Sequence, residues 1–114
     1  LAHMDPVRRN YLMNSMQLAR VTAATVTEKS KLDAMLDEVR TVGYAFDDEE
    51  HALGLRCVAA PLFDEHGQGV AAVSISGPSA RIPLERLSTL GRMVAQAASE
   101  ATRDYGGALP VAAQ

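Results

Sequence analysis

The sequence predicts one α+β domain in which an antiparallel sheet is covered on one face by helices. Three observations predict this class. Apolar residues recur at helical spacing in two segments, two extended apolar runs are joined by a short turn with glycines, and 114 residues are enough for a single core. Because three short strands make a thin sheet, we expect it to pair with further strands upstream or with a second chain.

Two helices are predicted in the first part of the chain. Asp5 and Pro6 form a typical helix start, so a short helix is expected over Val7–Met16. An extended link follows at Val21–Val26. Thr27 is then predicted to cap a second helix that Gly43 ends. The apolar face of this second helix comprises Leu32, Met35, Leu36 and Val39.

Three strands are predicted in the middle of the chain. Tyr44–Asp47 has the composition of a short strand, and Leu55–Phe63 and Val70–Ile75 are longer apolar runs. The six residues Asp64–Gly69 contain two glycines and predict a hairpin connection between the longer strands. Pro61 cannot donate a ladder hydrogen bond, so it indicates an edge strand or a bulge.

A long helix is predicted from about Pro83 to Tyr105, closed by Gly106 and Gly107. Its predicted apolar stripe comprises Leu87, Leu90, Val94, Ala97, Ala101 and Tyr105. The domain is therefore expected to span residues 1–107, with residues 108–114 as a flexible tail.

Composition and charge exclude several classes of protein. With 11 basic and 14 acidic residues the net charge is −3, and the basic residues are scattered, so this chain by itself is not expected to bind nucleic acid. No apolar run approaches the ~18 residues of a membrane helix, and no targeting segment is evident, which predicts a cytoplasmic location without a membrane partner. The single cysteine, Cys57, excludes an internal disulfide.

Candidate ligand chemistry lies on the two long predicted strands. Alternation places Leu55 and Cys57 on one face of the first strand, and Ser74 and Ser76 on one face of the second. If these faces coincide, they present a thiol, two hydroxyls and apolar walls to a small polar ligand. The alternative is that Cys57 is a small buried hydrophobe and that both serines bond nearby backbone.

The acidic run Asp47–Glu50 predicts a solvated loop, within which Asp47 differs because it ends a strand. An inward Asp47 would suit a hydroxyl, hydrate or ammonium partner, or would itself be protonated. His3, His51 and His66 have no metal-site spacing and are expected on the surface. A mid-strand Cys57 lacks a predicted base, so no catalytic residue, metal or cofactor is predicted, although a cysteine enzyme stays as a rival.

Several motifs, in this order and spacing, resemble the effector-binding domain of IclR-type transcription regulators. The resemblance covers Leu1 to about Gly107. The motifs are Gly43-Tyr44, the run Asp47-Asp48-Glu49-Glu50, the segment Gly54-Leu55-Arg56-Cys57-Val58-Ala59-Ala60, Phe63-Asp64-Glu65-His66, and Ser74-Ile75-Ser76-Gly77-Pro78.

This resemblance implies a GAF-like sensor whose pocket residues are Asp47, Cys57, Ser74 and Ser76, with Leu55 as an apolar wall. It implies a short 2-oxo acid effector, such as glyoxylate or pyruvate, and a homodimer or homotetramer whose rearrangement controls DNA binding. The DNA would be bound by a winged helix-turn-helix domain upstream, which this chain lacks, and part of the pocket would also lie upstream. A sensor of aromatic or other carboxylic acids and a pure oligomerisation module are the alternatives.

Overall fold

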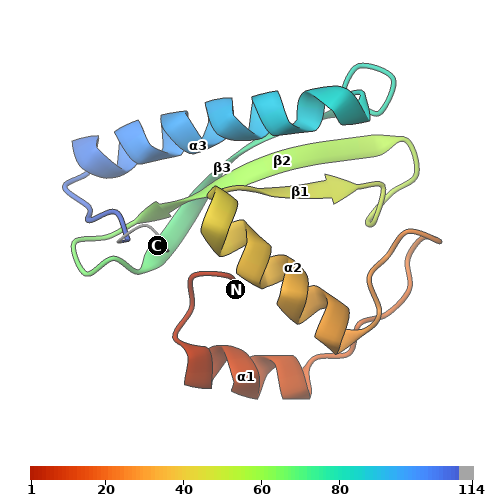
Figure 1. The fold of residues 1–114 in the computed structure, drawn as a ribbon, viewed down its shortest axis with the longest axis horizontal. Coiled ribbons are helices and arrows are strands. Elements are labelled where there is room, and N and C mark those ends of the chain that lie inside the picture. The colour runs from red at the N-terminus through yellow and green to blue at the C-terminus, as the bar shows by residue number, and fades with distance from the viewer. Residues whose placement is uncertain (111–114) are drawn as a thin grey trace.

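The computed structural model describes residues 1–110, and Figure 1 shows their fold. The described elements are α1 (Pro6–Ser15), α2 (Lys29–Val42), β1 (Ala45–Asp48), β2 (Leu55–Phe63), β3 (Gly69–Pro78), the 3₁₀ helix η1 (Leu84–Arg86) and α3 (Leu87–Asp104). The α+β class is confirmed. Within the described residues, β3 reaches three residues beyond its predicted end, and the first turn of the predicted last helix is 3₁₀.

The three strands form one antiparallel sheet in the order β1-β2-β3. The predicted hairpin joins β2 and β3, and Gly67 supplies the left-handed turn position with φ 74°. Pro61 lies on the central strand, opposite Ala72, so the edge prediction is wrong. The bulge prediction is supported nearby, because the register shifts between Leu62 and Phe63.

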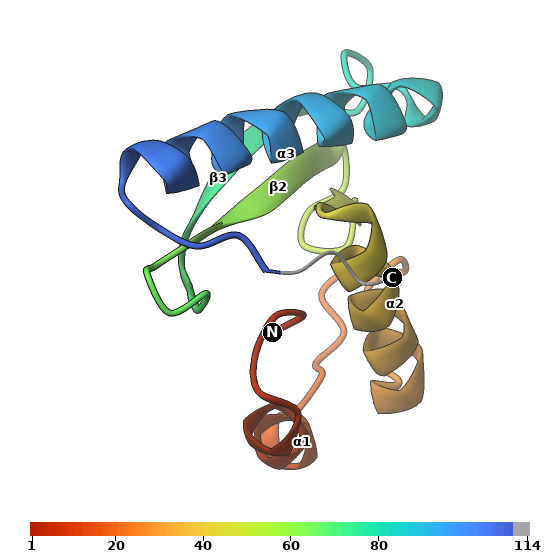
Figure 2. The same ribbon diagram turned by 60° about the vertical axis from the view of Figure 1, so that its left-hand side comes forward.

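One face of the sheet packs against α3, which lies along its length in Figures 1 and 2. The core between them comprises Val58, Ala60, Ile82, Leu87, Leu90, Val94 and Ala98. Tyr44 packs against this core, and its ring occupies the space that a Cβ at Gly91 would need. The glycine therefore sets how closely α3 approaches the sheet.

The predicted stripe of α3 is wrong in its second half. Ala98 and Thr102 are buried, whereas Ala97 is exposed and Tyr105 is 73% exposed. Thr102 is fully buried, and its hydroxyl accepts the backbone N–H of Phe63 at 3.2 Å, beside the bulge. This hydrogen bond satisfies the polar group in the core. A search for apolar residues alone could not find this contact, since a hydrogen-bonded threonine takes the core position.

The helices α1 and α2 lie on the opposite side of the sheet from α3 (Figures 1 and 2). The prediction that helices cover only one face of the sheet is therefore wrong. Arg9 of α1 is buried and joins the two helices, with its Nη2 at 2.6 Å from Asp33 and 3.1 Å from Asp37. A guanidinium has donors for both carboxylates at once. This link fixes α1 against α2.

The predicted helix ends differ in accuracy. Asp5 caps α1, since its Oδ1 accepts the N–H groups of Val7 and Arg8 at 3.1 Å each. Gly43 ends α2 with φ 89°. The Thr27 cap is wrong, because Glu28 is the N-cap of α2 and makes no capping bond.

Arg20 donates to the Thr27 hydroxyl at 3.3 Å, which gives Thr27 a different role. At the other end, Ala108 of the predicted tail donates its N–H to the carbonyl of Asp64 at 2.8 Å. Residues 111–114 of that tail lie outside the described residues.

Candidate ligand-binding site

The register brings three polar residues into one row across the sheet. Asp47 of β1 pairs directly with Cys57 of β2, which pairs directly with Ser76 of β3. Directly opposed residues of antiparallel strands point to the same face, with Cβ atoms about 4.5–5.5 Å apart. The cysteine and serine faces therefore coincide, as the prediction required, and Asp47 extends the same row.

The neighbouring rows complete this face of the sheet. Ser74 pairs with Ala59, and Leu55 pairs with Pro78, so both predicted residues flank the row of Asp47, Cys57 and Ser76. Leu55, Cys57 and Asp47 are half-buried, whereas Ser74 and Ser76 are exposed. Val58, which alternates with these residues, is fully buried toward α3. The candidate site thus lies on the face turned away from α3.

The acidic loop after β1 is held in place by hydrogen bonds. The Oδ1 of Asp47 accepts the N–H of Glu50 at 2.8 Å. From the extended link, the hydroxyl of Thr22 donates to the carbonyl of Glu49 at 2.6 Å, and the hydroxyl of Thr25 donates to the carbonyl of Glu50. The sequence predicts only an extended link at Val21–Val26. Its contacts with the acidic loop could not be predicted, because they join residues more than 20 positions apart and leave no local pattern.

The other two acids of the run turn to different partners. Asp48 accepts from Arg56 Nε at 2.7 Å, as alternation on β1 requires. Glu49 has φ 58° and its Oε1 accepts the N–H of Gly54 at 2.6 Å and the hydroxyl of Ser79 at 3.3 Å. The prediction of a merely solvated loop is therefore wrong: each acid of the run makes a hydrogen bond or lies partly buried near Asp47.

Arg56 connects this loop to the segment before α3. Its Nη1 donates to the carbonyls of Ile82 at 3.0 Å and of Ser79 at 3.3 Å. Its side chain is only 13% exposed. The end of β1 and the β3–η1 loop are therefore joined through one guanidinium, next to Asp47.

The electrostatics of the row favour a neutral thiol. Burial raises the pKa of Cys57, and the negative charge of Asp47 raises it further, while a hydrogen bond from Ser76 opposes both. A nucleophilic cysteine needs the reverse shift, toward the thiolate. Burial also raises the pKa of Glu50, followed in effect by the charge of Asp47, with Lys31 acting in the opposite direction.

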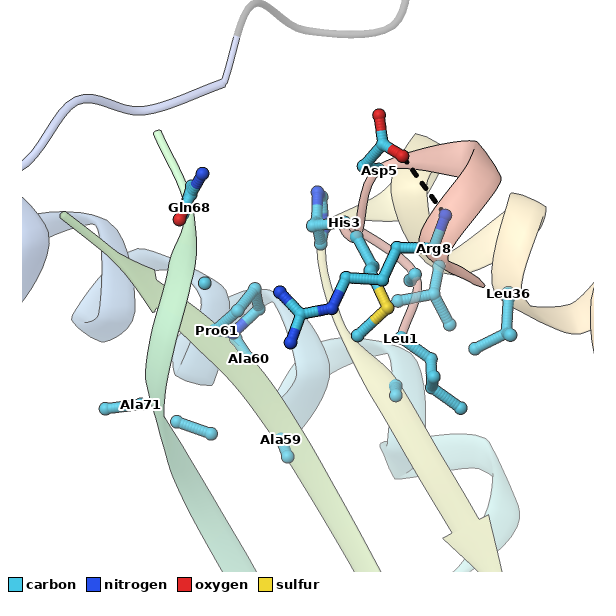
Figure 3. Close-up of a pocket in the computed structure, with 16 residues that line it drawn as sticks. Leu1, His3, Asp5, Arg8, Leu36, Ala59, Ala60, Pro61, Gln68 and Ala71 are labelled. Carbon is cyan, nitrogen blue, oxygen red and sulfur yellow. Dashed lines mark hydrogen bonds between the residues drawn. The ribbon is translucent and has the colours of Figure 1, made fainter. Parts of the chain in front are cut away.

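A cavity of about 450 Å³ lies on the same side of the sheet, between the first residues of the chain, α2 and the strands (Figure 3). Ala45, Ala59 and Pro61 form its floor, and Figure 3 shows Arg8 extending from α1 toward the strands. None of the five predicted site residues lines it. The cavity and the polar row are neighbours, since Ala59 is two residues from Cys57.

The three histidines differ in how exposed they are to solvent. His51 and His66 are exposed, as predicted. For His3 the prediction is wrong: its ring packs edge-to-face on Phe63 with centroids 5.0 Å apart, and its Nε2 is buried without a hydrogen-bond partner. Burial lowers the pKa of His3, and nearby Arg40 lowers it further. In residues 1–110, no three His, Cys, Asp or Glu side chains come together as a metal site would need.

The face of the sheet turned away from α3 thus offers a small ligand a thiol, two hydroxyls and a carboxylate, which is the chemistry of a small-molecule-binding domain. The sequence model for "Bacterial transcriptional regulator IclR C-terminal" matches residues 1–103. The chain therefore belongs to the IclR family, and it corresponds to the C-terminal effector-binding domain. The resemblance drawn from the sequence motifs is confirmed.

Individual relatives agree with this assignment. The chain is 50% identical over 107 residues to the acetate operon repressor of Salmonella typhimurium, and 47% identical over 107 residues to the transcriptional repressor IclR of Escherichia coli. Both alignments cover 94% of this chain and 39% of the relative. The chain thus spans about two-fifths of the length of these relatives. The motifs also indicate a likeness to the acetate operon repressor, which is confirmed.

A solved structure gives the same result for the fold. The C-terminal domain of the E. coli transcriptional regulator KdgR superimposes with a TM-score of 0.82 at 37% identity, covering 93% of this chain and 65% of that one.

These relatives are transcription regulators and not enzymes, which decides against the hypothesis that the chain is a cysteine enzyme. In residues 1–110, no helix is both long and apolar enough to span a bilayer.

Proposed function

We propose that this chain senses a short 2-oxo acid, such as glyoxylate or pyruvate, for a DNA-binding transcription regulator. The observation that carries the proposal is the direct pairing of Asp47, Cys57 and Ser76 across the sheet, with Ser74 in the adjacent row. These four residues supply two hydroxyl donors, a neutral thiol and one carboxylate within a small area. Their chemistry matches a ligand with an anionic end and a hydroxyl-bearing end.

The two ends of such an acid have different partners in this site. The effector carboxylate accepts hydrogen bonds from the hydroxyls of Ser74 and Ser76, which are exposed and free to turn toward it. Glyoxylate is hydrated in water, and a hydroxyl of the hydrate can donate to Asp47. The neutral Cys57 lies between them, and Leu55 closes one end as an apolar wall.

The regulatory role is proposed from the relatives. The two most similar relatives described above are named repressors, and the acetate operon repressor suggests control of acetate use and of the glyoxylate bypass. We propose that effector occupancy changes the arrangement of a homodimer or homotetramer and so alters DNA binding by a winged helix-turn-helix domain. The segment from Asp47 to Glu49 is joined through Arg56 to the carbonyl of Ile82, just before η1 and α3, and is a physical route for that change.

Calorimetry of the full-length gene product against glyoxylate, pyruvate, acetate and an aromatic acid tests the ligand class. We expect the two 2-oxo acids to bind, and replacing Ser74 or Ser76 by Ala to weaken binding on the order of tenfold each, because each removes a charge-assisted hydrogen bond. Ser30→Ala on the exposed face of α2 is the matched control. Binding of the aromatic acid alone contradicts the pocket assignment.

A pure oligomerisation module is the second candidate, supported by the long β3, whose outer edge is unpaired in residues 1–110 and which exposes Val70 and Ile75. It predicts that the double variant Ser74→Ala, Ser76→Ala keeps its full response to added acid in a DNA-binding assay. Loss of that response with an unchanged oligomeric state supports the sensor instead.

A further inference from the structure

Two successive arginines of α1 have different surroundings. Arg9 is buried, and its guanidinium is paired with Asp33 and Asp37. Arg8 is exposed, and within residues 1–110 its side chain makes no hydrogen bond and no ion pair, since only its backbone N–H is bonded, to Asp5 at 3.1 Å. Figure 3 shows the guanidinium of Arg8 extending from α1 toward the strands, in the cavity of about 450 Å³ that it lines.

We propose that this cavity is a second ligand site, which binds a monocarboxylic acid with an aliphatic tail of about four to eight carbons. Arg8 binds the carboxylate of this acid, and the tail lies against the apolar walls. The site is separate from the polar row, because none of the five predicted site residues lines the cavity. The proposal therefore goes beyond the sensing of a 2-oxo acid.

The walls of the cavity are mainly apolar and come from a helix and all three strands. They include Leu36 and Val39 of α2, Ala45 of β1, Ala59 and Pro61 of β2, and Ala72 of β3. Alanines and a proline leave space above the sheet that larger side chains would fill. A volume of about 450 Å³ lies in the range of roughly 300–1,000 Å³ that is usual for small-molecule pockets, and walls without polar groups suit an aliphatic chain.

His3, in the segment before α1, is a second polar group at the cavity (Figure 3). Its Nε2 is buried and has no hydrogen-bond partner within residues 1–110. A buried polar atom without a partner costs free energy, and a ligand that bonds to it recovers that cost. Burial lowers the pKa of His3, so the ring is neutral at pH 7, and its Nε2 can donate one N–H to a carboxylate oxygen.

The charges around the cavity favour an anion over a cation. Arg8 lines the cavity, and Arg40 lies near enough to His3 to lower its pKa further. Asp5 is the one carboxylate among the described lining residues, and its Oδ1 already accepts the N–H groups of Val7 and Arg8 at the start of α1. The positive end of that helix adds to the attraction for an anion.

Titration calorimetry of the full-length gene product with acetate, butyrate and hexanoate tests the site, and hexylamine is the probe of opposite charge. We expect the affinity to rise about three- to fourfold for each CH₂ added between acetate and hexanoate, because each CH₂ buries apolar surface on the cavity walls. Hexylamine is expected not to bind. An arginine that merely lies on the surface would bind all three acids equally weakly.

Three variants identify the groups that bind hexanoate. Arg8→Gln removes the charge and should weaken hexanoate binding by on the order of tenfold or more, because a charge-assisted hydrogen bond is lost. His3→Phe keeps an aromatic ring against Phe63 but removes the Nε2 donor, and should weaken binding several-fold. Arg92→Gln, an exposed arginine of α3 on the other side of the sheet, is the matched control and should bind hexanoate as the natural protein does.

The outcomes separate this site from the polar row. Ser76→Ala should weaken glyoxylate binding and leave hexanoate binding unchanged, and Arg8→Gln should do the reverse. Loss of hexanoate binding in Ser76→Ala would assign that acid to the polar row and overturn the second site.

The second site is also overturned if hexanoate does not bind the natural protein, if acetate and hexanoate bind equally, or if hexanoate binding persists in Arg8→Gln. Each of these results leaves the sensor proposal intact, and failure of glyoxylate and pyruvate alone overturns only the sensor proposal. The chain-length series uses the natural protein, so it decides even where circular dichroism shows that a variant is unfolded.

Discussion

Cys57 of β2 is paired directly with Ser76 of β3, so the thiol and the hydroxyl project from the same face of the sheet. The pairing gives the thiol a polar neighbour on one side and the carboxylate of Asp47 on the other. In this environment the cysteine is a neutral contact group rather than a nucleophile, because both burial and Asp47 raise its pKa.

The reactivity of Cys57 follows from this environment. We predict that iodoacetamide alkylates the folded protein at pH 7 several-fold more slowly than the unfolded chain, because the raised pKa leaves less thiolate. Asp47→Asn removes the charge that disfavours the thiolate and should speed alkylation. Asp104→Asn, on the exposed end of α3, is the control. The prediction fails if both variants react at the rate of the natural protein.

Thr102 is predicted to be a stabilising core residue through its hydroxyl. Thr102→Val keeps the volume but leaves the N–H of Phe63 without its partner, so we expect a loss of about 1–3 kcal/mol in the free energy of unfolding. Thr89→Val, on the exposed face of the same helix, should change it by less than about 0.5 kcal/mol. Urea denaturation of both variants checks this, and equal losses would contradict it.

Gly91 is predicted to tolerate no side chain while Tyr44 keeps its place. Gly91→Ala forces the ring away from α3, and overpacking of this kind costs about 1–3 kcal/mol, more than the better helix propensity of alanine returns. The double variant Tyr44→Leu, Gly91→Ala should be more stable than the sum of the single changes indicates. Thermal unfolding of the four proteins measures this coupling, and strict additivity would refute the contact.

His3 is predicted to make the protein less stable at mildly acidic pH. Its lowered pKa means that the folded state holds fewer protons than the unfolded state, so its contribution is complete above the ordinary value of 6.5. That contribution declines as the pH falls through the lowered folded pKa. His3→Phe should flatten this part of the stability curve, and His51→Gln on the surface should not. Denaturant unfolding at a series of pH values distinguishes them.

The positions of the helices and strands could be read from the sequence because their signals are local. Asp5, Gly43 and the apolar run Leu55–Phe63 each act within a few residues, and the structure confirms them. Thr27 shows the limit, because its hydroxyl is used by Arg20 and the helix starts at Lys29 without a side-chain cap. The burial of Thr102 and of His3 also escaped prediction, since each depends on Phe63, far away in the chain.

By itself the sequence determined the family, the α+β class and which side chains of the two long strands share a face, because strand alternation and motif order are properties of the chain alone. Only the tertiary structure decided that Asp47, Cys57 and Ser76 form one row, that the acids of the loop have separate partners, and that Glu50 lies beside the site. The physical reason is that strand register and loop hydrogen bonds are fixed by contacts between distant residues, which no local pattern specifies.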